Sequence, residues 1–382
     1  KGGSIFYGIG LYKKYNIFKL YGVSGFSHNQ LAFYGTPIND SISYTTNLNS
    51  INDKDKFNQN LISLNWVNFS KDNLKFNTSA YFGNVNGIYN TGGINFGVNS
   101  QQYGLMSNMV YESKYNFINL SLNANTYKRE HFGQDYNGVY FDTISISDYR
   151  NIGYKNDIST FFKYIRVVNK FNLFTDIQFR YVYFKTERNN IEDINYNWIF
   201  LNPKAGIKYN LNRNSSFYTS IAYTQREPTR TDVIQGVIQK KNIMFGNPDN
   251  TIWIKNDPYF TSEKVTDFEL GYTYKSQFII INTNVYFMNI DNEFVSTGVI
   301  DPFSGFTIKK SISSTNRYGF ESDGNITYNR FKFFYTLNYQ LSKMKTDDSL
   351  NNREIPFNPN FLTSIGSTFT YNKFICGLSG RY

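Results

Sequence analysis

Side chains of opposite character alternate along many short segments of this chain, and this alternation limits the fold more than any other feature. Residues 118–127, which read INLSLNANTY, show it clearly. Because successive side chains of an extended strand point to opposite faces, such a segment has one apolar face and one polar face. A soluble β-sandwich would bury the apolar face in a protein core, whereas a transmembrane β-barrel would turn it to lipid. In the barrel the lipid-facing residues are Ile118, Leu120, Leu122 and Ala124, and the interior-facing ones are Asn119, Ser121, Asn123 and Asn125.

Tight polar turns join the alternating segments in pairs, which indicates β-hairpins. The turns are predicted at residues 13–15, 70–73, 114–116, 169–170, 212–215, 275–277, 329–332 and 371–373. The connections between hairpins are longer, at residues 27–56, 89–101, 133–154, 188–197, 227–263, 292–314 and 345–360. Short and long connections alternate in this way in an up-and-down barrel, with tight turns on the periplasmic rim and long loops outside. A sandwich with Greek-key crossings would mix both kinds at both ends.

The lengths of the segments also suit a membrane-spanning barrel. Residues 74–84, 173–184 and 217–224 are close to the roughly 9–11 residues that a tilted strand needs to cross the apolar layer. Aromatic side chains near segment ends would form a girdle at the lipid headgroups or, alternatively, ordinary cross-strand pairs. These aromatic residues are Tyr223, Tyr272, Tyr274 and Tyr339.

Composition supports strands and excludes membrane helices. The chain has 33 Tyr and 36 Phe, and aromatic residues favour strands. The longest apolar run, residues 278–288, is interrupted by Asn282 and Asn284, so no helix of roughly 20 apolar residues can be drawn. A closed barrel is the other way to span a bilayer, because it pairs every backbone group between strands. We therefore predict an all-β fold, an antiparallel up-and-down transmembrane β-barrel with about sixteen visible strands and no internal domain boundary.

The cysteine count and the net charge exclude several other classes. The single Cys376 allows no intrachain disulfide, and within its predicted strand we expect it to be a small buried residue. The net charge of +10 comes from Lys and Arg spread over turns and loops without a recognition motif, so we expect no nucleic-acid partner. A basic surface of this kind would instead lie among lipid phosphates or attract anionic ligands.

The first and last predicted strands, near residues 5–12 and 374–382, would leave unpaired edges in lipid. Unsatisfied backbone groups in lipid cost several kcal/mol each. We therefore expect the sequence to be an internal piece of a longer chain.

Several motifs, in their order along the chain, resemble TonB-dependent outer-membrane receptors of the Bacteroidetes type. The most specific are QREPTRTD at residues 225–232, GNPD at 246–249 and SEKVTDFELGYTY at 262–274, with Ser262 where the family has Pro. The others are YGTPINDSI at 34–42, DKFNQN at 55–60, EHFG at 130–133, NLFTDIQFRY at 172–181, VSTG at 295–298 and RYGFE at 317–321.

This resemblance implies a fold, a location and a role. Residues 1–382 would form a receptor barrel domain in the bacterial outer membrane, with about 14–16 strands of a 22-stranded barrel. The plug domain, the TonB box and the final strands would lie outside this sequence. The implied function is active uptake of a scarce nutrient, an iron-siderophore-type chelate before haem, cobalamin or a glycan. The implied partners are outer-membrane lipid, the nutrient and the TonB-ExbB-ExbD complex, and a surface lipoprotein is left open.

Residues 226–263 contain the predicted ligand loop. Basic and aromatic side chains there suit an anionic chelate with flat rings. The candidates are Arg226, Glu227, Arg230, Asp232, Lys240, Lys241 and Trp253. In the alternative reading, Arg226, Glu227 and Asp232 form a salt-bridge network that fixes the loop base. Arg129 and His131 share the polar parity of Asn125 and are candidate lumen ligands, or else rim residues bonded to their neighbours.

No residue pattern indicates catalysis, a metal or a cofactor. His28 and His131 are the two histidines of the chain, and neither belongs to a metal, nucleotide or nucleophile motif. We therefore expect no enzyme. The alternatives are a passive porin, a barrel-borne hydrolase that would need one of these histidines as base, and a soluble β-rich adhesin.

Overall fold

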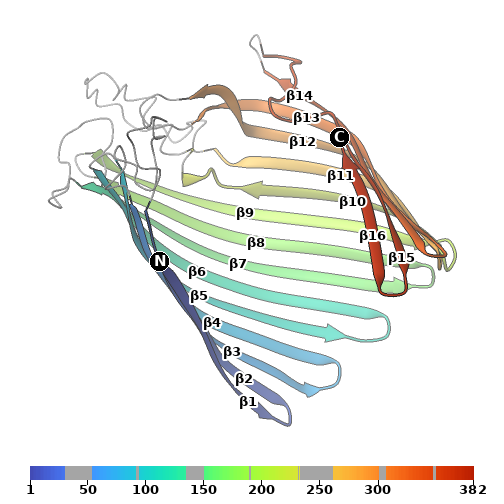
Figure 1. The fold of residues 1–382 in the computed structure, drawn as a ribbon, viewed down its shortest axis with the longest axis horizontal. Coiled ribbons are helices and arrows are strands. Elements are labelled where there is room, and N and C mark those ends of the chain that lie inside the picture. The colour runs from blue at the N-terminus through green and yellow to red at the C-terminus, as the bar shows by residue number, and fades with distance from the viewer. Residues whose placement is uncertain are drawn as a thin grey trace, which may run out of the picture. The chain divides into compact units, whose positions relative to one another are not determined.

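A computed structural model describes residues 1–30, 54–91, 94–134, 150–188, 191–230, 232, 261–300, 307–346 and 350–382. Sixteen strands lie within these residues (Figure 1). They are β1 Gly2–Lys13, β2 Asn16–Gln30, β3 Lys54–Lys71, β4 Leu74–Thr91, β5 Ile94–Glu112, β6 Asn116–Gln134, β7 Asn151–Val168, β8 Phe171–Arg188, β9 Ile191–Asn210, β10 Ser215–Arg226, β11 Glu263–Lys275, β12 Ile279–Ile300, β13 Thr307–Tyr328, β14 Phe331–Lys345, β15 Phe361–Tyr371 and β16 Phe374–Arg381. No helix among the described residues is long and apolar enough to cross a membrane.

The strands follow one another in the sheet in chain order, from β1 to β16. The registers between neighbours are antiparallel, for example Phe217 opposite Tyr272 and Arg226 opposite Glu263 between β10 and β11. This order confirms the up-and-down topology and excludes the Greek-key crossings of a sandwich.

The chain divides into two compact units. The first unit comprises Lys1–Glu112, Asn119–Phe161 and Phe179–Ile199. The second comprises Ser113–Ile118, Phe162–Gln178 and Phe200–Tyr382.

The two faces of the sheet differ as the alternation predicts. In the first unit Leu120 and Leu122 are 45% and 40% exposed. The opposite parity is hydrogen-bonded across strands, because Asn108 Nδ2 donates to Asn119 Oδ1 at 2.6 Å and to Ser121 Oγ at 2.7 Å. Among the described residues no second sheet buries the apolar parity, and hydrocarbon is the solvent that suits an exposed apolar face.

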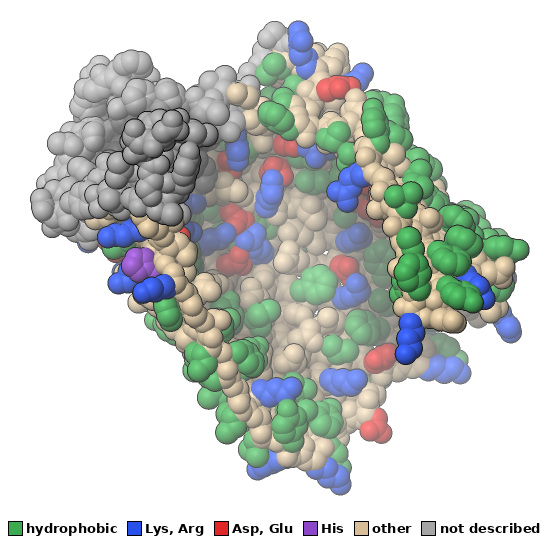
Figure 2. Space-filling view, in the orientation of Figure 1, with side chains coloured by type: hydrophobic (Ala, Val, Ile, Leu, Met, Phe, Trp, Pro, Cys, Tyr) green, Lys and Arg blue, Asp and Glu red, His purple; other side chains and the backbone are tan. Residues whose placement is uncertain are grey.

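The second unit has the same apolar face. Phe268, Leu270, Val285 and Phe287 point to it from β11 and β12 and are 43–49% exposed. Figure 2 shows hydrophobic side chains covering the surface over β14, β15 and β16, at the right of the view. Cys376 lies on this exposed face of β16, so the prediction that it is buried is wrong. Every residue of β16 is exposed, on the parity of Cys376 and Leu378 as on that of Ile375.

All eight predicted tight turns are confirmed as connections between paired strands. Five of them have two residues, and three of these five begin with Asn169, Asn329 or Asn372, whose φ values are 53°, 52° and 53°. A positive φ at this position is what the primed turns of two-residue hairpins require, and Asn accepts it more readily than most residues.

Two predicted long connections are wrong. β4 ends at Thr91 and β5 begins at Ile94, where residues 89–101 were expected to be a loop, and β8 and β9 are separated by two residues instead of 188–197. The connection at 292–314 is also shorter, because β12 runs to Ile300 and β13 begins at Thr307. Long connections remain at 227–262 and 346–360. The other two, 27–56 and 133–154, fall largely outside the described residues.

These differences have one cause, which is that the strands are longer than a membrane crossing. β4 and β8 have 18 residues each and β12 has 22. At about 3.3 Å per residue and a tilt of about 45°, 18 residues span roughly 40 Å, well beyond an apolar band of about 25 Å. Backbone pairing continues past the membrane, where side chains no longer follow the lipid-facing alternation; Val295 of β12, for example, is buried there against Ile312 and Met344.

Aromatic pairs line the apolar face near the tight turns. Ring centroids lie 4.9 Å apart for Phe171 and Tyr209 and 4.8 Å apart for Phe217 and Tyr272. Tyr272 therefore fits both predictions made for these aromatic residues. It lies on the apolar face, as a girdle residue would, and it pairs with an aromatic residue on the neighbouring strand.

Glycines on the polar face receive aromatic rings from the neighbouring strand. A Cβ at Gly271 would lie 2.0 Å from Cε1 of Tyr218, and one at Gly319 would lie 2.6 Å from Cζ of Tyr286. Each ring occupies the space that a side chain would fill, which locks β10 against β11 and β12 against β13.

Candidate functional site

The predicted ligand loop leaves β10 and enters β11 through a pair of oppositely charged residues. Arg226 ends β10 and Glu263 begins β11, directly opposite each other in the register. Arg226 Nε lies 2.9 Å from Glu263 Oε1, and Nη2 donates to Oε2 at 3.0 Å. This two-pronged pair closes the base of the loop, because a guanidinium and a carboxylate match in geometry as well as in charge.

A second ion pair links strand β13 to the connection that follows β10. Asp232 is 4% exposed, and its Oδ1 accepts a hydrogen bond from Lys309 Nζ at 2.7 Å. Its Oδ2 accepts from the backbone N of Thr229 at 3.0 Å and from the Thr229 hydroxyl. The Asp232 backbone N donates back to Thr229 Oγ1 at 3.3 Å, which resembles the reciprocal bonding of a capping box. Both carboxylate oxygens are satisfied, so this buried charge is held in one position.

A third pair joins β12 and β13. Glu293 accepts from the guanidinium of Arg317 and from the hydroxyl of Thr315. The preceding residue, Asn292, has a φ of 58°, and its Nδ2 donates to the backbone O of Ser262 at 3.2 Å. This hydrogen bond attaches β12 to the residue that precedes β11.

We call Arg226, Glu263, Thr229, Asp232, Lys309, Glu293, Arg317 and Thr315 the loop base. Its six charged groups form three ion pairs, each between one basic and one acidic side chain. The pairs link β10 to β11, the connection after β10 to β13, and β12 to β13. The described residues contain no group of three or more His, Cys, Asp or Glu that would hold a metal ion.

The loop base includes two predicted residues and several that sequence reasoning missed. Arg226 and Asp232 each take an ion-pair partner from another strand, and Glu227 and Arg230 lie in the same connection. Lys240, Lys241 and Trp253 lie outside the described residues. The missed partners are Glu263, Lys309, Glu293 and Arg317. Glu263 and Arg317 fall within the motifs SEKV and RYGFE, which gave a signal, whereas Lys309 had none.

Arg129 and His131 belong to the first unit, near the loop end of β6. Their parity is that of Asn125, whose Nδ2 donates to the hydroxyl of Tyr81 at 2.6 Å on the polar face. Arg129 Nε is buried and has no hydrogen-bond partner within the described part of the chain. An ion pair that sequence reasoning missed lies on the same face, with Arg180 Nε donating to Asp157 Oδ2 at 2.9 Å.

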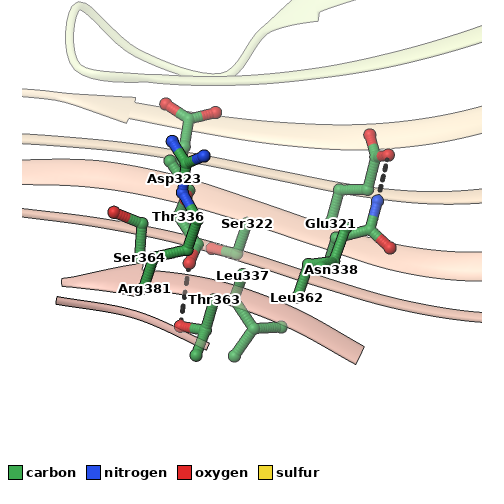
Figure 3. Close-up of a pocket in the computed structure, with 10 residues that line it drawn as sticks. All are labelled: Glu321, Ser322, Asp323, Thr336, Leu337, Asn338, Leu362, Thr363, Ser364 and Arg381. Carbon is green, nitrogen blue, oxygen red and sulfur yellow. Dashed lines mark hydrogen bonds between the residues drawn. The ribbon is translucent and has the colours of Figure 1, made fainter. Parts of the chain in front are cut away.

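A groove of about 420 Å³ lies on the second unit across β13, β14, β15 and β16 (Figure 3). Asn338 Nδ2 donates to Glu321 Oε1 at 2.9 Å within it, and Asp323 and Arg381 lie at its other side. Its carboxylates, amides and hydroxyls can donate to and accept from a polar ligand. No residue of this groove was among the candidate site residues predicted from the sequence.

Comparison with known proteins assigns the chain to a family. A family model described as TonB dependent receptor-like, beta-barrel matches residues 4–382. The solved structure of the copper transporter OprC has a TM-score of 0.73 at 12% identity, and the match covers all of this chain and 59% of that one. The ferric-catecholate import receptor Fiu from K12 E. coli has a TM-score of 0.68 at 12% identity, covering all of this chain and 63% of that one.

The ferric yersiniabactin uptake receptor FyuA from Yersinia pestis has a TM-score of 0.66 at 12% identity, covering all of this chain and 58% of that one. This chain therefore spans about three fifths of the length of these structures. No curated protein matches the chain. The match over residues 4–382, together with the strand order, shows that this chain belongs to the TonB-dependent receptor β-barrel family and lies in the outer membrane.

Proposed function

We propose that this chain is the barrel domain of a TonB-dependent receptor that takes up a scarce nutrient, and that the nutrient is an iron-siderophore-type chelate. The family match over residues 4–382 carries the proposal. Structures of similar fold include receptors described as importing ferric catecholate and ferric yersiniabactin, which supports the chelate class. The coupling partner in this proposal is the TonB-ExbB-ExbD complex.

The loop base supports a role for Arg226 in binding an anionic chelate. Arg226 uses Nε and Nη2 toward Glu263, and its side chain is 66% exposed. A guanidinium carries five N–H donors, so the Nη1 donors can reach a ligand held by the loop. Glu263 fixes the direction of these donors, which reduces the entropy lost when a ligand binds.

Growth under iron limitation tests this function. A strain lacking the gene is supplied with one iron source at a time, namely defined siderophores, haem or iron salts, with cobalamin and glycans tested as nutrients in parallel. We expect growth on at least one siderophore to depend on the gene and on TonB. An Arg226→Gln variant should bind that chelate roughly tenfold more weakly, the loss of one charge-assisted hydrogen bond.

Other outcomes would contradict the proposal in distinct ways. Gene-dependent uptake that continues without TonB would make the protein a passive channel. Growth on every iron source without the gene would reject the iron chelate. Lipid or peptide hydrolysis lost in His28→Ala or His131→Ala would indicate a barrel-borne enzyme.

A further inference from the structure

The tight turns of the second unit carry a set of basic side chains with no acidic side chain among them. We call this set the turn rim: Lys114, Lys170, Arg213, Lys275, Arg330 and Lys373. Each lies in a connection between hairpin strands or, for Lys275, at the last position of β11. No Asp or Glu occupies these connections, and of the strand residues that adjoin them Glu112, at the end of β5, is the acidic one. The turn rim therefore has a charge of +6, and the turns of β9 to β16 are seen at the lower right in Figure 1.

Hydrogen bonds from hairpin to hairpin make these six residues neighbours in sequence order. Asn210 N donates to Lys170 O at 2.8 Å, and Lys275 N donates to Asn214 O at 2.7 Å. Further along, Thr327 N donates to Phe278 O at 2.7 Å and Thr370 N to Arg330 O at 2.8 Å. At the start of the series, Val167 N donates to Tyr115 O at 2.9 Å. Backbone contacts thus hold the cations in a continuous row, so they act on one surface.

The cations of the turn rim are exposed and form no ion pair among the described residues. All six are exposed, and none forms an ion pair with a described residue. The partners they do have are neutral: Lys170 Nζ donates to Leu211 O at 3.2 Å, Lys114 Nζ lies 5.0 Å from the Tyr115 ring, and Arg330 lies 4.3 Å from the Tyr371 ring. The loop base shows the opposite arrangement, because every charge described there is paired.

An apolar aromatic layer lies directly beside the turn rim. Phe171, Phe217, Phe331 and Phe374 begin or nearly begin the strands that leave these turns, and each is at least 43% exposed on the apolar face. Exposed rings at this depth mark the boundary between hydrocarbon and headgroups. Cations placed just beyond that boundary lie at the depth of lipid phosphates.

We infer that the turn rim of the second unit is a binding surface for anionic phospholipid headgroups of the leaflet that faces the turns. Six unpaired cations beside an aromatic layer match a plane of phosphates in both charge and depth. The interaction fixes the height of the barrel in the membrane and enriches phosphatidylglycerol or cardiolipin around it. The inference rests on the location in the outer membrane and is independent of the nutrient proposed above.

Native mass spectrometry of the intact protein, extracted from bilayers of phosphatidylglycerol and phosphatidylcholine, tests the inference. The wild-type protein should retain phosphatidylglycerol in preference to phosphatidylcholine, and the preference should fall as salt is raised, because salt screens exposed charges. The triple variant Lys170→Gln, Arg213→Gln, Lys275→Gln should retain phosphatidylglycerol roughly tenfold less, since each cation near such a surface contributes appreciably. The charge-keeping triple Lys170→Arg, Arg213→Lys, Lys275→Arg should retain it as the wild type does.

A matched control removes three cations from the loop ends of strands in the same unit. The triple Lys264→Gln, Lys343→Gln, Lys345→Gln changes the net charge equally and should leave retention unchanged. Equal loss in both neutralised triples would overturn the inference, as would a wild-type protein with no preference for phosphatidylglycerol. Binding of purified peptidoglycan that depends on the turn rim, with unchanged lipid retention, would assign the surface to the cell wall instead. Nutrient uptake is measured separately, so failure here is distinguishable from failure of the proposed function.

Discussion

At the scale of single residues, the loop base shows how a long connection is held at its root. Asp232 is buried with both carboxylate oxygens bonded, and its cationic partner Lys309 is 77 residues away in the sequence. A buried carboxylate without a counter-ion is costly, so the attachment of this connection to β13 depends on Lys309.

Removal of Lys309 should loosen that connection. In Lys309→Met, Asp232 keeps its bonds to Thr229 and loses its charged partner, which should cost about 1–3 kcal/mol. Cleavage by chymotrypsin within residues 227–262 should therefore become roughly tenfold faster. The double variant Lys309→Met, Asp232→Asn should be less sensitive than Lys309→Met alone, because no unpaired charge remains. Lys264→Met serves as control, and an equal rise in that variant would show that the pair does not hold the loop.

At the scale of elements, neighbouring strands are locked by aromatic rings that lie over glycines. Tyr218 covers Gly271, and Tyr286 covers Gly319. Glycine lowers the intrinsic preference for a strand, and the aromatic ring that covers it supplies the packing that a side chain at the glycine would have made. Glycine is required at these sites because the aromatic ring lies so close to the backbone, and not because of the backbone conformation.

Gly271→Ala should therefore destabilise the barrel by about 1–3 kcal/mol, the cost of overpacking, since the added Cβ would lie 2.0 Å from the Tyr218 ring. Equilibrium urea unfolding in lipid vesicles measures this. Gly83→Ala is the control, because its Cβ would meet nothing closer than 3.5 Å. Combining Gly271→Ala with Tyr218→Ser should recover most of the loss. Absence of coupling between the two changes would mean that the ring does not need the space.

At the scale of the whole molecule, the fold depends on a different environment for each face of the strands, hydrocarbon on the apolar face and a polar interior on the other. One parity of the strands exposes Phe268, Leu270 and Phe287, and the other carries Asp267, Glu269 and Glu321. Acidic and basic side chains stand among polar ones on the face turned to the viewer in Figure 2. An exposed apolar surface of this extent is stable only against hydrocarbon, which agrees with the family and its outer-membrane location.

A charge on the apolar face should thus be far more costly than the same charge on the polar face. Leu270 lies five residues from the turn end of β11, which at about 3.3 Å per residue and a tilt of about 45° is roughly midway through the apolar band. Leu270→Arg should destabilise the folded barrel by about 2–4 kcal/mol in the same vesicle assay. Asn284→Arg, on the polar face beside Gly271 and Glu321, should cost less than about 1 kcal/mol. Similar losses for both would argue against lipid on the apolar side.

Much of this architecture was predictable because it depends on local patterns. Period-two alternation, as in residues 118–127, determines which side chain meets which solvent, and turn residues such as Asn169 and Asn329 determine where the chain reverses. Burial of Cys376 was wrongly predicted, because both faces of β16 are exposed, and two loops were wrongly predicted where paired strands continue beyond the membrane.

The loop base and the turn rim required the tertiary structure. The partners Arg226 and Glu263 are 37 residues apart, and only the register between β10 and β11 brings them opposite each other. The same register places rings over glycines and joins six separate turns into one basic row. Sequence by itself determined the faces, the turns and the strand order, because these follow from neighbours along the chain. Only the tertiary structure decided which distant charges form pairs, because that depends on the register between neighbouring strands.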